Sequence, residues 1–203
     1  MIKKIYLICR YFKENGGSYS GAYTAFAKYA TEKGIDVIIL SGHKKGDQGV
    51  KQTPYGRIYR LSLSKWKVPL LGMNADYLAL SKGVKTFFKY HPILPGDIII
   101  ANGRAALGVL NQRFILRSGQ PAKAVLKSME IAKDEVSLVT RGARLINTYI
   151  GHSLEKICYV NATAFMLPST DTKNHINNVY EIKNRPSFIP FSGIGYGIKE
   201  TQK

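Results

Sequence analysis

The sequence predicts an α/β protein with a Rossmann-like, doubly wound, mostly parallel sheet of about seven strands and helices on both faces. Two observations carry this prediction. Short apolar runs alternate with segments of helical spacing along the 203 residues. A glycine pair also stands where the first apolar run gives way to the first helical segment, as in a β-loop-α-β unit.

The first half of the chain supplies four of the expected strands. Apolar residues three and four positions apart indicate helices, and the alternation of side chains after Gly56 indicates a strand near a sheet edge. The polar, glycine-rich stretch before Gly56 is expected to be a loop. The expected elements are a strand at 2–9, a helix at 20–33, strands at 35–41 and 57–64, a helix from Asn74 or Asp76 to about Tyr90, and a strand at 97–101.

The second half continues the alternation. Its best helical pattern runs from Leu138 to Asn161, where apolar residues recur at three and four positions. The other expected elements are a helix at 104–117, a strand at 122–129, a strand at 163–167, a helix at 171–183 capped by Ser169 or Thr170, and a last strand at 187–190. Residues 1–190 then form one domain. Residues 191–203 are glycine-rich and are expected to be a hinge or tail toward an absent C-terminal domain.

Charge is the unusual part of the composition. Thirty basic residues against thirteen acidic ones give a net charge of +17. Such an excess attracts nucleic acid, acidic lipid or phosphorylated substrates, although it also serves solubility. No apolar run reaches the length of a membrane span, and the run that begins at Ile5 is too short for a signal peptide. We therefore expect a cytoplasmic protein whose two cysteines are core thiols.

The first candidate site is the loop that contains Gly16, Gly17 and Ser18. The loop joins the carboxyl end of the first strand to a helix N-terminus, where free N–H groups can bind an anion such as phosphate. Its glycines lack the spacing of a dinucleotide fingerprint, and no acidic residue ends the second strand to hold a ribose. A plain turn is the alternative interpretation.

The carboxyl ends of two later strands should lie at the same edge of a parallel sheet. They bring Asn102 and Arg104 after one strand, and Lys127, Ser128 and Glu130 after the next. An amide, a guanidinium and a carboxylate at one rim could orient sugar hydroxyls and a phosphate. The alternative is that Asn102 caps a helix and Glu130 is a solvated loop residue.

A third candidate is a short basic and apolar segment outside regular structure. Its membrane-facing residues would be Lys65, Trp66, Lys67, Leu70 and Leu71. Tryptophan between lysines suits a membrane–water interface, and lysines are attracted to anionic lipid. The alternative is that Trp66 and the leucines pack onto the core. The four histidines lie on separate elements without metal-ligand spacing, so neither a metal nor a cofactor is expected.

Several segments together resemble the N-terminal, acceptor-side domain of a family 4-like GT-B glycosyltransferase. The Gly16-Gly17-Ser18 loop and the run Lys33-Gly34-Ile35-Asp36-Val37 match its first β-α-β unit. Residues 154–169 resemble its long helix with a Leu-Glu pair and the strand that follows. Residues 188–194, Phe-Ile-Pro-Phe-Ser-Gly-Ile, resemble the segment that crosses into the second domain.

The resemblance implies transfer of a sugar from a nucleotide-sugar donor to a saccharide or lipid-linked acceptor. It implies that the second domain, which would bind the donor, lies outside this chain, so that the chain alone is inactive. The sequence departs from the family where Ser128, Met129 and Glu130 replace a frequent histidine. Combined with the charge, the resemblance predicts peripheral binding to the inner face of an anionic membrane, and self-association is plausible. The alternative function is a basic nucleic-acid-binding module on a Rossmann-like scaffold, which lacks a recognised RNA-stacking pattern.

Overall fold

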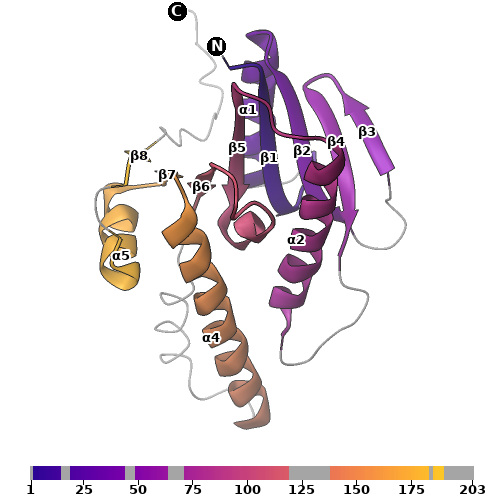
Figure 1. Cartoon of the computed structure of the whole chain (residues 1–203). Helices are drawn as coiled ribbons and strands as arrows, with labels where there is room; N and C mark the ends of the chain where they lie inside the picture. The colour runs from indigo at the N-terminus through magenta and orange to yellow at the C-terminus, as the bar shows by residue number, and fades with distance from the viewer. Residues whose placement is uncertain are drawn as a thin grey trace, which may run out of the picture.

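The described residues form an eight-stranded sheet flanked by helices (Figure 1). The computed structural model describes residues 2–14, 19–43, 49–63, 71–118, 138–182 and 185–189. The sheet order is β3-β4-β2-β1-β5-β6-β7-β8. Every neighbouring pair is parallel except β3 and β4, which form an antiparallel hairpin at one edge. The predicted doubly wound, mostly parallel sheet is confirmed, with eight strands rather than about seven.

The first half of the chain adds strands on one side of β1 and then adds β5 on the other side. It contains β1 (Lys4–Tyr11), α1 (Tyr19–Glu32), β2 (Asp36–His43), β3 (Gly49–Thr53), β4 (Gly56–Ser62), α2 (Met73–Tyr90) and β5 (Asp97–Asn102). After β4 the chain returns through α2 to place β5 on the other side of β1. Since strand-to-strand crossovers are right-handed, this reversal puts α1 and α2 on opposite faces.

The second half extends the sheet on the β5 side. It contains the 3₁₀ helix η1 (Gly103–Gly108), β6 (Ile115–Arg117), α4 (Leu138–Asn161), β7 (Ala164–Met166), α5 (Thr170–Tyr180) and β8 (Ser187–Phe188). The long helix α4 has the predicted bounds. Ser169 caps α5 as predicted, because its hydroxyl accepts a hydrogen bond of 3.1 Å from the Thr172 N–H.

Three predictions about elements were wrong. The helix expected at 104–117 is a short 3₁₀ helix followed by β6, whose Leu116 lies wholly buried between β5 and β7. The loop expected before Gly56 contains β3, a strand exposed enough to show little apolar patterning. Neither Asn74 nor Asp76 caps α2, because Gly72 occupies that position. The strand expected at 122–129 lies outside the described residues.

Two hydrophobic clusters hold the helices to the sheet. On one face, Tyr23 and Ala27 of α1 pack against Leu7 of β1 and Ile39 of β2. On the other face, α2, η1, α4 and α5 pack on the sheet, β1 and β2 included, through a larger cluster that includes Leu80, Phe114, Tyr159 and Tyr180. Helices therefore lie on both faces, as the sequence predicts. Cys9 and Cys158 are buried free thiols within these clusters.

No helix in the described ranges is long and apolar enough to cross a membrane.

The larger cluster predicts a contrast between two leucines of α2. Leu80 is fully buried, whereas Leu78, two positions earlier, is 44% exposed. Leu80→Ala should lower the free energy of unfolding by about 2–5 kcal/mol, through lost burial and a residual cavity. Leu78→Ala should change it by less than about 0.5 kcal/mol. Urea titrations followed by circular dichroism measure both, and equal effects would show that α2 does not pack through this face.

Candidate functional site

The candidate site lies where the direction of sheet growth reverses. β1 pairs with β2 on one side and with β5 on the other, in parallel register from Lys4 with Asp97 to Ile8 with Ala101. In open α/β sheets, ligands bind outside the carboxyl ends of strands at such a switch point. The residues that follow these paired segments are Arg10 and Tyr11 on β1, and Asn102 and Arg104 after β5.

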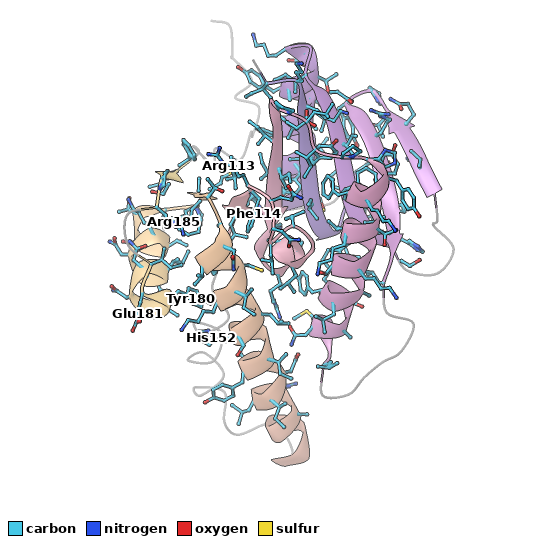
Figure 2. All side chains as sticks on the ribbon, in the orientation of Figure 1. Arg113, Phe114, His152, Tyr180, Glu181 and Arg185 are labelled. Atoms are coloured by element: carbon cyan, nitrogen blue, oxygen red, sulfur yellow. The ribbon has the colours of Figure 1, made fainter. Side chains whose placement is uncertain are left out.

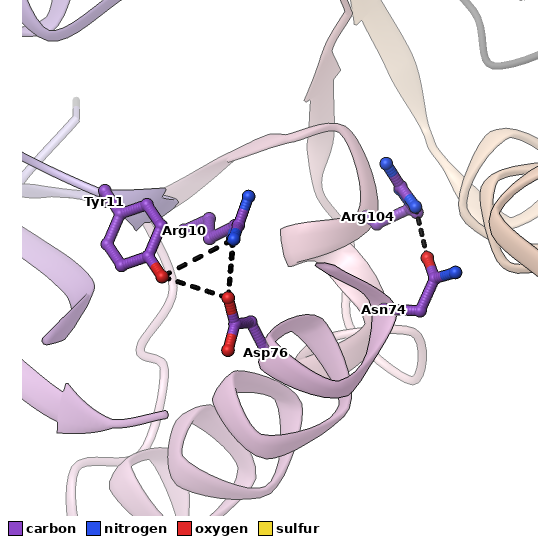
Figure 3. Close-up of polar contacts among 5 residues, drawn as sticks. All are labelled: Arg10, Tyr11, Asn74, Asp76 and Arg104. Carbon is purple, nitrogen blue, oxygen red and sulfur yellow. Dashed lines mark hydrogen bonds and ion pairs between the residues drawn. The ribbon is translucent and has the colours of Figure 1, made fainter. Parts of the chain in front are cut away.

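The first part of the site is a buried ion pair between β1 and α2 (Figure 3). Arg10 donates hydrogen bonds from Nη2 and Nε to Asp76 Oδ2, at 2.6 and 3.0 Å, and the Tyr11 hydroxyl donates to the same oxygen at 3.0 Å. The side chains of Arg10 and Asp76 are only 20% and 18% exposed. Burial lowers the pKa of Arg10, but the bond to Asp76, together with the charge of that carboxylate and the nearby Tyr11 and Tyr77, outweighs burial, so the pKa of Arg10 is raised. Arg10 therefore stays charged.

The second part is a network that holds Arg104. The Arg104 Nη1 donates to Asn74 Oδ1 (Figure 3). Asn74 Nδ2 in turn donates to the carbonyl and side-chain oxygens of Asn147, at 2.8 and 2.6 Å. Asn74 is fully buried, so its side chain depends on these partners. Gly151 of α4 leaves room for the guanidinium, because a Cβ there would lie 2.7 Å from Arg104 Nη1.

An acidic residue of α4 completes this network. Glu155, 8% exposed, lies 3.9 Å from Arg104 Nε through Oε1 and accepts a hydrogen bond of 2.9 Å from the Tyr180 hydroxyl through Oε2. Burial and the nearby Glu155 carboxylate raise the pKa of Tyr180, which therefore remains a donor. Tyr180 also stacks on His152, and the two side chains lie together between α4 and α5 (Figure 2).

Tyr77 links the two arginines. Its ring centroid lies 4.7 Å from the Arg104 guanidinium carbon and 5.7 Å from that of Arg10. Such distances allow cation–π attraction. Burial raises the pKa of the Tyr77 hydroxyl, although the two cations oppose that rise. Two guanidiniums, each held by an acid, thus face one ring at the switch point, and each has five N–H donors suited to phosphate or carboxylate oxygens.

Two further arginines lie toward the α1 face of the same edge. Arg60 Nη1 donates to the Phe12 carbonyl at 2.6 Å, and the Arg117 guanidinium carbon lies 5.4 Å from the Tyr23 ring centroid. Burial raises the pKa of Cys9 to about 12, while Arg60 and Arg117 are close enough to oppose the rise. With no acidic residue in its first turn, α1 begins in a positively charged setting.

The structure describes three of the residues that the sequence predicts for binding. Arg104 belongs to the network above. Asn102 is half-buried, pairs in register with Arg117 and makes no side-chain cap bond to η1, so the capping alternative is not realised. Leu71 is half-buried ahead of α2. The others lie outside the described residues: Gly16, Gly17, Ser18, Lys65, Trp66, Lys67, Leu70, Lys127, Ser128 and Glu130.

Sequence reasoning missed most of the polar network. Arg10 directly follows an apolar strand run, so its position at the carboxyl end of that strand could have identified it as a candidate site residue. Asn74 and Asp76 were considered only as helix caps, and Glu155 only as part of a Leu-Glu pair. Their roles depend on α2 and α4 meeting beside η1, which no local pattern reveals.

Solved structures of sugar-transferring proteins share the fold of this chain. A sucrose-phosphate synthase from Thermosynechococcus elongatus matches with a TM-score of 0.63 and 16% identity, over 92% of this chain and 47% of that one. A shorter chain of the same synthase matches with a TM-score of 0.56 and 13% identity, over 95% and 91%. UGT71G1 from Medicago truncatula, in complex with UDP-glucose, matches with a TM-score of 0.53 and 12% identity, over 92% and 51%.

This chain has the fold of the N-terminal domain of a GT-B glycosyltransferase. It spans about half the length of the full synthase chain and of UGT71G1. No protein-family model matches the sequence, and no curated protein matches it. Identities of 12–16% establish the fold alone.

The network predicts that Glu155 stabilises the site. Glu155→Ala removes the acceptor of the Tyr180 hydroxyl and leaves Arg104, still bonded to Asn74, without its acidic partner, and should lower the free energy of unfolding by about 2–4 kcal/mol. Glu155→Gln keeps an acceptor for Tyr180 and should cost less. Glu32→Ala, at an exposed position of α1, is the control and should have little effect. Chemical denaturation measures all three, and a Glu155→Ala protein as stable as the control would contradict the network.

Proposed function

We propose that this chain is the acceptor-side half of a glycosyltransferase, which moves a sugar from a nucleotide-sugar donor to a saccharide or lipid-linked acceptor. The observation that carries the proposal is the pair of arginines, Arg10 and Arg104, fixed at the switch point of a GT-B-type domain. Fixed cations suit a reaction in which a diphosphate leaves with negative charge, because electrostatic groups held in place need no reorganisation as that charge develops.

Within this proposal the residues divide by task. The backbone amides of Gly16 and Gly17 would meet part of the charge on the leaving diphosphate, with Ser18 beside them. Asn102, Arg104, Lys127, Ser128 and Glu130 would orient the acceptor. Arg104 is held by Asn74 and Glu155 on its protein side, which restricts its rotamers before any ligand arrives. Such restriction reduces the entropy lost on binding.

The donor half would lie outside residues 1–190. Residues 191–203 would lead toward a second domain that binds the nucleotide sugar, and the 203 residues alone would then have no transfer activity. We further propose a cytoplasmic location on the inner face of a membrane and a role in polysaccharide biosynthesis. The net charge of +17 supports docking on anionic lipid, with Lys65, Trp66, Lys67, Leu70 and Leu71 as the contact segment.

Activity measurements test the missing half. The purified 203 residues, supplied with a panel of nucleotide sugars and lipid-linked or saccharide acceptors, should show no transfer. The same chain joined to a donor-binding domain should be active, and Arg104→Met in that enzyme should lower kcat/KM about 10²- to 10³-fold. Lys28→Met, at an exposed position of α1, is the matched control and should leave kcat/KM unchanged. Turnover by the 203 residues alone would refute the proposal that a separate domain binds the donor.

Binding at matched salt distinguishes the membrane from nucleic acid. The net charge also favours a second candidate, a nucleic-acid-binding module. The chain should co-sediment with vesicles containing anionic phospholipid and not with neutral vesicles, and should show no saturable binding to single-stranded RNA. Binding should weaken as salt rises, since surface charges are screened. Retention on RNA without retention on anionic vesicles would favour the second candidate.

A further inference from the structure

A second surface, distinct from the arginine site, is an elongated groove between β4 and α2. It has a volume of about 560 Å³, within the range of small-molecule sites. Its strand side runs from Tyr59 to Leu63 and its helix side from Ala79 to Tyr90. At 1.5 Å per residue the helix side is about 16 Å long, so the groove has the proportions of an extended chain rather than of a sugar ring.

The lining of this groove is mainly apolar. The Tyr59 and Phe87 rings in its lining meet edge to face at a centroid distance of 4.9 Å. Gly83 lets α2 approach β4 closely, because a Cβ there would lie 3.3 Å from Leu61 Cβ. Tyr90, which also lines the groove, is 71% exposed. Polar groups such as those of Ser62 and Lys82 contribute to the lining, but its surface is mainly apolar, which suits a hydrocarbon chain.

One end of the groove adjoins the arginine site. Ala79 lies three residues after Asp76 on α2, and therefore on the same side of the helix as the Arg10–Asp76 ion pair. Leu63 lies beside Gly42, where an added Cβ would meet both Leu63 Cδ2 and the Arg10 carbonyl oxygen, at 2.3 and 2.5 Å. A chain in the groove would thus bring its head group to the carboxyl edge of the sheet.

The charge around the groove favours an anionic head. Lys82 lines the groove, and Lys85 and Lys89 are exposed on the same helix. The charges of Arg10 and Asp76 offset each other, so Lys82 leaves an excess of positive charge near this end of the groove. A phosphate or diphosphate is the anionic group that ammonium and guanidinium groups bind best.

We propose that this groove binds the hydrocarbon chain of an anionic, phosphate-bearing lipid, and that this lipid is the acceptor. The second part rests on the proposed function, whereas the binding itself does not. The groove then explains how the acceptor's head reaches Arg10 while its tail stays out of water.

Calorimetry with decyl phosphate below its critical micelle concentration tests the binding. The chain should bind one equivalent with a negative heat-capacity change, the marker of apolar burial. Butyl phosphate, with the same head and a shorter chain, should bind at least about tenfold more weakly, because each buried CH₂ contributes about 0.8 kcal/mol. Absence of saturable binding, or equal affinity for the two phosphates, would overturn the proposal.

Paired variants locate the bound chain. Thr86→Trp fills the groove from an exposed position and should weaken decyl phosphate binding at least about tenfold. Leu78→Trp, exposed on the same helix but outside the groove, should leave affinity within twofold. Lys82→Gln should weaken binding more than Lys85→Gln. Circular dichroism and thermal melts confirm folding, and equal affinities for Thr86→Trp and Leu78→Trp would place the ligand elsewhere.

Failure here is distinguishable from failure of the proposed function. If the enzyme joined to a donor domain glycosylates a short water-soluble acceptor while the groove variants bind decyl phosphate normally, the groove proposal falls and the transferase stands. If decyl phosphate binds in the groove but no sugar is transferred by any form of the enzyme, the groove proposal stands as a lipid site and the transferase falls.

Discussion

The parallel pairing of β1 with both β2 and β5 is the constraint on which the site depends. Parallel strands end at one edge, so residues far apart in sequence, such as Arg10 and Arg104, come to the same place. The crossover through α2 then brings Asn74, Asp76 and Tyr77 to that edge as well. If β5 paired in the opposite direction, its polar end would lie at the far side of the sheet and the two arginines would not lie against the same Tyr77 ring.

Hydrogen bonds, rather than apolar packing, fix the side chains at this edge. Arg10 is anchored by β1's neighbour α2, and Arg104 by α2 and α4 together. Each arginine is more than three-quarters buried, and isolated buried cations are costly unless paired. Asp76 and Glu155 therefore offset the repulsion between the Arg10 and Arg104 cations, which can then lie close together. Any change in the angle of α4 would be transmitted to Arg104 through Glu155.

The sequence predicted the layers well and the site only in part. Periodicity located β1, α1, β2, α4 and α5, because their apolar faces pack on one sheet. Periodicity wrongly predicted a helix at 104–117. Phe114 and Leu116 are buried there because β6 pairs with β5 on one side and with β7 on the other. The contacts of Asn74 and Glu155 escaped prediction because their partners lie 25 to 73 residues away. Arg104 was proposed from the sequence because strand ends can be located from local pattern alone, and the structure places it beside the end of β5.

Gly151 lowers the stability of helix α4, and the space that it leaves is occupied by a residue from another part of the chain, Arg104. Glycine inside a helix is about 1 kcal/mol less favourable than alanine, and α4 carries it midway along its 24 residues. A bulkier residue would favour the helix yet displace the guanidinium beneath it. Helix propensity and the position of Arg104 therefore oppose each other at this residue, and an alanine that favoured α4 would disturb the contact between Arg104 and Asn74.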